Sequence, residues 1–65
     1  MHHSKYIIYN SDSYELELDT EGNLLHVWRY LHNEPSSPRY VQLANCDEQL
    51  RDLIESRVIQ LHGQH

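Results

Sequence analysis

Apolar and polar residues alternate along the first part of this chain and change to a helical spacing near its end. A period of two is typical of strands with one buried face, whereas spacings of three and four residues are typical of an amphipathic helix. The pattern therefore predicts an α+β fold: an antiparallel meander of three to four strands over residues 5–43, with one C-terminal helix over residues 45–62 packed on one face.

Four segments carry the strand pattern. Residues 5–10 are β-branched and aromatic at their centre, and residues 14–19 follow a turn at 10–13 and alternate strictly. The third segment, residues 24–32, is apolar on both faces, which is typical of a strand covered on both sides. A short fourth strand is predicted at 39–43, after a loop over residues 33–38 whose two prolines should prevent ladder pairing.

The hairpin turn at residues 19–23 allows two registers. Its glycine suits the left-handed position of a three-residue loop, which places Leu18 opposite Leu24. A four-residue loop places Leu18 opposite Leu25 and improves the hydrophobic and charge pairing. The register decides which face becomes the core, and the sequence leaves both alternatives open. The first register pairs Leu16 with His26 and Tyr14 with Trp28, and the second pairs Leu16 with Val27 and Glu17 with His26.

The predicted helix has recognisable ends. Asn45 is a favoured N-cap, and Glu48 three residues later has the spacing of a capping box. Gly63 lies where a C-terminal glycine cap is expected, and Ile59 lies off the apolar stripe. The residues of that stripe, which should face the sheet, are Leu50, Leu53, Ile54, Val58 and Leu61.

Composition limits the classes of partner. The chain has 65 residues, which suit one small domain, and residues 1–4 are expected to be a disordered end or an expression remnant. One cysteine, no apolar run of membrane-spanning length and no signal-peptide pattern predict a cytoplasmic protein without a membrane partner. The formal charge of −5 and the scattered basic residues disfavour direct nucleic-acid binding and suit a basic protein partner or solubility.

One helix can cover only one face of the sheet, although both faces carry apolar residues. A large uncovered apolar face indicates an interface, formed by a homodimer or with another protein. Tryptophan, tyrosine and arginine are enriched at interface centres, which selects Trp28, Arg29 and Tyr30. Depending on the register, the uncovered set is Trp28 and Tyr30 with Tyr14, or Leu25, Val27 and Leu31. The competing interpretation is that Trp28 is the core tryptophan beneath the helix.

No motif predicts catalysis, a metal or a cofactor. The N-terminal Met1-His2-His3 could bind Cu(II) or Ni(II) as any such end does, and the His62/His65 pair is too small for a closed site. A thiol-dependent reaction at Cys46 would require a histidine, His26 or His32, beside it. The chain is therefore predicted not to be an enzyme.

The predicted function is that of a small acidic interaction module that binds and regulates a larger protein, as a homodimer, with Glu15 and Glu17 contributing to its surface. The alternative is a phage or mobile-element inhibitor that mimics nucleic acid on a host protein. Mimicry requires a contiguous acidic face, formed by Asp12, Glu15, Glu17, Asp19 and Glu21.

Overall fold

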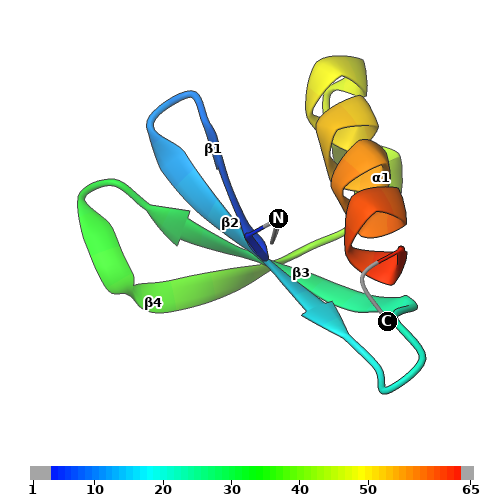
Figure 1. Cartoon of the computed structure of the whole chain (residues 1–65). Helices are drawn as coiled ribbons and strands as arrows, with labels where there is room; N and C mark the ends of the chain where they lie inside the picture. The colour runs from blue at the N-terminus through cyan, green and yellow to red at the C-terminus, as the bar shows by residue number, and fades with distance from the viewer. Residues whose placement is uncertain (1–3, 64–65) are drawn as a thin grey trace.

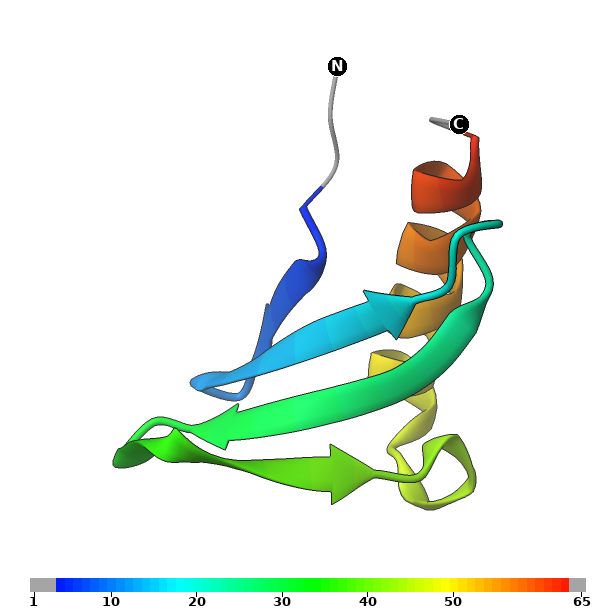
Figure 2. The same ribbon diagram turned by 90° about the horizontal axis from the view of Figure 1, so that it is seen from below.

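A computed structural model describes residues 4–63 and confirms the α+β meander in its four-stranded form. All neighbouring strands are antiparallel, in the order β1-β2-β3-β4, and α1 lies along one side of the sheet (Figure 1). Figure 2 shows the strands in front of α1, so that the side turned to the viewer is not covered by the helix. The elements are β1 (Tyr6–Tyr9), β2 (Asp12–Leu18), β3 (Leu24–Leu31), β4 (Glu34–Val41), a 3₁₀ turn (Leu43–Asn45) and α1 (Glu48–His62).

The core lies between α1 and one face of the sheet. Burial alternates along β2, as expected for a strand with one covered face. On α1 the buried stripe is narrower than predicted, because Leu53 is 46% exposed, while Ile59 is exposed as its position off the stripe indicates. The buried apolar residues are Ile7, Tyr14, Leu16, Val27, Leu50, Ile54 and Leu61.

The β2–β3 hairpin combines the two predicted registers. Leu18 lies opposite Leu24, as the three-residue loop requires, and Gly22 has the expected left-handed φ of 87°. One residue farther from the turn the register shifts, and Leu16 lies opposite Val27 as in the four-residue alternative. The shift is a β-bulge that leaves Leu25 as the extra residue of β3.

The prediction of a loop over residues 33–38 is wrong. The strand β4 begins at Glu34 and runs through both prolines to Val41, and Leu43 belongs to the 3₁₀ turn instead of the strand. Proline is tolerated here because β4 is an edge strand, with a neighbour on one side only. The ladder is nevertheless interrupted: it pairs Leu31 with Glu34 and Arg29 with Arg39, so residues 35–38 lie opposite Tyr30 alone.

The start of the helix also differs from the prediction. The N-cap is Asp47 instead of Asn45, and it makes no side-chain capping hydrogen bond. Asn45 closes the preceding 3₁₀ turn, which lets Leu43 and Cys46 pack against the core. Gly63 does occupy the C-cap, but with a right-handed φ of −69°, so the helix ends without the left-handed turn.

The β1–β2 turn places two non-glycine residues at positive φ. Asn10 has φ 50° and Ser11 has φ 72°, between the paired residues Tyr9 and Asp12. Positive φ at both central residues is the conformation of a type I′ turn, which favours Asn-Gly. Asn10 fits this turn, whereas the Cβ of Ser11 is disfavoured in the left-handed region.

Ser11→Gly is therefore expected to stabilise the fold by about 1 kcal/mol, because glycine adopts positive φ without steric cost. Urea unfolding followed by circular dichroism measures the change. Ser13→Gly is the matched control, since Ser13 is an ordinary strand residue of β2, and this variant should be destabilised. Equal effects of the two substitutions would contradict the strain at Ser11.

The helix also closes the outer edge of β1. Nη1 of Arg57 donates to the backbone oxygens of Ser4 at 2.6 Å and Tyr6 at 3.2 Å. The backbone N–H of Tyr6 donates to Oγ of Ser4 at 3.0 Å. An open strand edge can pair with a foreign strand, so these contacts protect the short edge strand β1.

Arg57→Met should cost about 1 kcal/mol and raise the exchange rates of the β1 amides more than those of β3. Methionine keeps much of the aliphatic stem but cannot donate to the two carbonyls. Native-state hydrogen exchange measures the difference. Arg51→Met on the same helix is the control and should leave β1 exchange unchanged, and uniform acceleration in the Arg57 variant would show that the contact is not local.

Candidate interaction surface

The side of the sheet away from α1, turned to the viewer in Figure 2, is here called the open face. Strand pairing and alternation assign to it the exposed aromatic residues Tyr6 and Tyr40. Side chains alternate along each strand, so the neighbours of buried core residues point to this side. The register then aligns Tyr6, Glu15, Trp28 and Tyr40 in one row across all four strands. Strand alternation and register assign to the open face Tyr6, Ile8, Ser13, Glu15, Glu17, His26, Trp28, Tyr30 and Tyr40.

Two carboxylates of β2 are held in place by aromatic side chains on this face. The hydroxyl of Tyr30 donates to Oε1 of Glu15 at 2.8 Å, and the hydroxyl of Tyr6 donates to Oε2 at 3.0 Å. Nε1 of Trp28 donates to Oε1 of Glu17 at 3.1 Å, and Nδ1 of His26 lies 3.1 Å from Oε2. Each carboxylate oxygen thus has one aromatic partner, which fixes the position of both negative charges.

The hydrogen bonds change the acid–base properties of these groups. The contacts of Glu17 with His26 and then Trp28 hold the pKa of its carboxyl below the usual value. The hydrogen bonds to Glu15 raise the pKa of Tyr6 and Tyr30, because ionising a phenol beside a carboxylate is unfavourable. At neutral pH the open face therefore presents an ionised Glu17 and neutral phenols.

Tyr40 packs edge to face with the rings of Trp28 and His26 beside these carboxylates. The ring centroids of Trp28 and Tyr40 are 5.9 Å apart at 76°, and those of His26 and Tyr40 are 5.7 Å apart at 67°. The His26 and Trp28 centroids are 5.9 Å apart. Such arrangements are favourable for aromatic rings, and they give the three side chains a common fixed geometry.

The predicted surface residues divide between the two faces of the sheet. Trp28 and Tyr30 lie on the open face with both glutamates, so the interpretation of Trp28 as the core residue beneath α1 is wrong. Tyr14 is buried in the core, and Arg29 lies opposite it on the same side. The structure adds Tyr40 and His26 to the open face. Strand alternation could assign these two residues to that face only after the register was known.

Arg29 is engaged in a partly buried ion pair. Its Nε donates to Oδ2 of Asp12 at 2.9 Å, and its Nη2 binds the same oxygen. Oδ1 of Asp12 accepts the backbone N–H of His32 at 2.9 Å. This ion pair joins the start of β2 to β3, so the contact that Arg29 makes here is a structural one within the sheet.

The five acidic residues considered for mimicry do not lie on one face. Asp12 shares the side of Tyr14 and Leu16, whereas Glu15 and Glu17 occupy the open face. Asp19 turns its Oδ1 to the backbone N–H groups of the hairpin turn, at 2.9 Å from the nitrogens of residues 21 and 23. The open face therefore presents two fixed carboxylates among aromatic rings instead of a line of charges.

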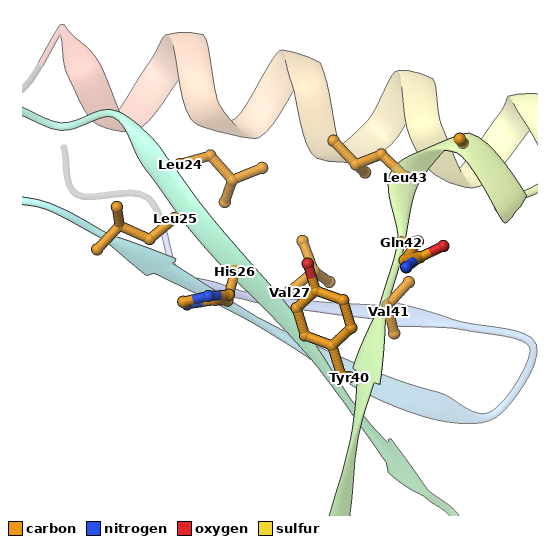
Figure 3. A pocket seen from close by; sticks show the side chains of 9 residues that line it. Leu24, Leu25, His26, Val27, Tyr40, Val41, Gln42 and Leu43 are labelled. Carbon is orange, nitrogen blue, oxygen red and sulfur yellow. The ribbon is translucent and has the colours of Figure 1, made fainter.

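A hollow of about 390 Å³ lies where β4 ends, next to the rings of His26 and Tyr40 (Figure 3). Its lining includes His26 and Tyr40, which belong to the open face, and Leu24 and Leu43, which lie closer to α1. The hollow forms because β4 stops at Val41, opposite Val27, while β3 continues toward the hairpin turn. It gives the open face a concave rim next to Tyr40.

The other groups with chemical potential do not converge in the described residues. Cys46 packs against the core, where burial raises the pKa of its thiol, while His26 lies on the open face. Within residues 4–63, no group of three or more histidine, cysteine or acidic residues is placed to hold a metal. Met1-His2-His3 and His65 lie outside the described residues. In the same range no helix has the length and apolar character needed to cross a membrane.

Comparison with known proteins identifies no relative of this chain. No protein-family model matches it, and no match was found among curated proteins or solved structures. A functional assignment must therefore start from the residues and geometry of the open face.

Proposed function

We propose that this chain is a small acidic, non-enzymatic interaction module that binds and regulates a larger protein through its open face. The supporting observation is the aromatic row that α1 leaves uncovered, with Tyr40 56% exposed at the end of the row. Aromatic residues are enriched at the centres of protein interfaces, and hydrogen-bonded side chains lose little conformational freedom on binding. Trp28, held by Glu17, is the expected centre of the contact.

The charge distribution favours a foreign partner over a second copy on this face. Face-to-face packing of two copies would bring together the Glu15 and Glu17 carboxylates of both. Among the described residues, alternation places no lysine or arginine of the sheet there, because Lys5, Arg29 and Arg39 share the parity of residues that face α1. Like charges without a basic partner oppose such a dimer.

Site-specific photo-crosslinking in the cells that produce this chain tests the proposal. A photoreactive phenylalanine analogue in place of Tyr40 should crosslink to one defined larger protein. Trp28→Ala in the same chain should reduce the yield at least tenfold, because a buried interface tryptophan contributes about 2 kcal/mol or more. Light scattering on the purified chain reports its solution mass in parallel.

The matched control places the analogue at Ile59, which is 73% exposed on α1. This position should not crosslink to the same protein. Equal yields from both positions, or an unchanged yield with Trp28→Ala, would contradict an interface on the open face. A stable species of twice the chain mass that dissociates with Trp28→Ala would show that a second copy occupies the face instead.

A further inference from the structure

We infer that the open face binds arginine side chains of an extended basic segment in the partner protein, an inference that rests on the proposed function. The occupant follows from three properties of the open face: fixed negative charges, aromatic rings beside them, and the absence of lysine and arginine among the described residues that alternation assigns to this face.

The first step concerns the unused capacity of the carboxylates. An ionised carboxylate can accept about four hydrogen bonds, two on each oxygen. Glu15 uses one on each oxygen with Tyr30 and Tyr6, and Glu17 uses one on each oxygen with Trp28 and His26. Each therefore keeps acceptor capacity for a donor from outside, with its position already set.

The second step concerns the rings. A guanidinium group stacks on the face of tryptophan or tyrosine and donates to carboxylates in a planar fork, which an ammonium group cannot do. Trp28 and Tyr40 supply the ring surfaces, and Glu17 lies within hydrogen-bond distance of Trp28. Arginine is thus the side chain that matches both kinds of group at once.

The third step concerns spacing and charge. Glu15 and Glu17 are two residues apart on β2, a separation of about 7 Å at the rise of a strand. Alternate residues of an extended segment have the same separation, so arginines at alternate positions can face the two carboxylates together. The formal charge of −5 adds attraction for a basic segment during encounter.

A peptide titration tests this chemistry without knowledge of the partner. The probe is a short serine peptide with two arginines at alternate positions, and its control carries citrulline, the neutral isostere of arginine, at the same positions. Trp28 is the only tryptophan of the chain, so its fluorescence reports from the site itself. We expect the citrulline peptide to bind at least tenfold more weakly than the arginine peptide. A third peptide, with lysine at the same two positions, should have an affinity between the two, and added salt should weaken binding of the arginine peptide.

Charge-neutral variants locate the binding. Glu15→Gln and Glu17→Gln keep an acceptor oxygen for the aromatic donors but remove the charge, and each should weaken the arginine peptide about fivefold. Glu55→Gln removes the same charge from an exposed position on α1 and should change the affinity less than twofold. Urea unfolding of each variant verifies folding, and the salt series on the unaltered chain needs no variant.

The outcomes separate this inference from the proposed function. Equal binding of the arginine and citrulline peptides, or equal losses for Glu17→Gln and Glu55→Gln, would overturn the arginine inference. If crosslinking from Tyr40 still identified a partner, the interaction module would stand with another kind of ligand. If Ile59 crosslinked equally well, the interface on the open face would fail.

Discussion

Ile54→Ala should lower the free energy of unfolding by about 2–5 kcal/mol. Ile54 is fully buried on α1, at 0% exposure, so truncation removes apolar contacts and leaves a cavity between the helix and the sheet. A chain of this length has a total stability of about 3–10 kcal/mol, so the loss is a large fraction of the total and should lower the unfolding midpoint markedly. Thermal and urea unfolding followed by circular dichroism measure the loss.

Ile59→Ala is the matched control for this experiment. It removes the same atoms from the same helix, but Ile59 is mostly exposed, and the change should stay within about 0.5 kcal/mol. If Ile59→Ala lost as much stability as Ile54→Ala, either the assignment of the side of α1 that faces the sheet would be wrong, or a second molecule would cover Ile59 in solution. Repeating the measurement at several concentrations distinguishes these two results.

Asp12→Asn should cause the second largest loss in the free energy of unfolding. It should also weaken the dependence of that free energy on pH in the acidic range. The guanidinium of Arg29, and then the backbone N–H of His32, hold the pKa of Asp12 below its usual value. A carboxyl with a depressed folded pKa stabilises the fold fully above its unfolded pKa, near 3.9 for aspartate. This stabilisation is lost as the pH falls from about 5 through the lower folded pKa.

Urea unfolding at a series of pH values from 7 to 2 measures this effect. The unaltered chain should lose stability steadily below about pH 5, and the variant should start lower and decline less. Some decline should remain, because the pKa values of Glu17 and Asp19 are also lowered by their hydrogen bonds. Asp52→Asn, at an exposed position of α1, is the control and should show the same pH dependence of stability as the unaltered chain. If the stability of the Asp12 variant fell with pH as steeply as that of the unaltered chain, the role of the ion pair would be contradicted.

The elements predicted well from the sequence were those with a strong local pattern. Strict alternation identified β2, and the spacing of Leu50, Ile54 and Leu61 identified the buried side of α1. Gly22 marked the hairpin because glycine is the residue that adopts a left-handed position with the least steric cost. In each case the physical cause lies within a few residues of the element itself.

The parts that could not be predicted depend on contacts distant in sequence. Prolines normally exclude a strand, but β4 tolerates them because it is at the edge of the sheet, which only the assembled topology reveals. Asn45 is a favoured N-cap with the spacing of a capping box, yet the helix begins after Asp47, because residues 43–45 form a 3₁₀ turn from which Leu43 packs against the core. The open face was predicted only in part, because its residues follow from the register of β3 against β2.

The bulge at Leu25 has a consequence for the evolution of this fold. Without that residue, the pairing of Leu24 with Leu18 would continue directly into that of His26 with Glu17, in an uninterrupted ladder. The side chain of Leu25 is half exposed and is not among the buried core residues. A homologue shortened by one residue at this point could keep the same two surfaces, so divergent members of such a lineage would align by structure with a gap inside a strand.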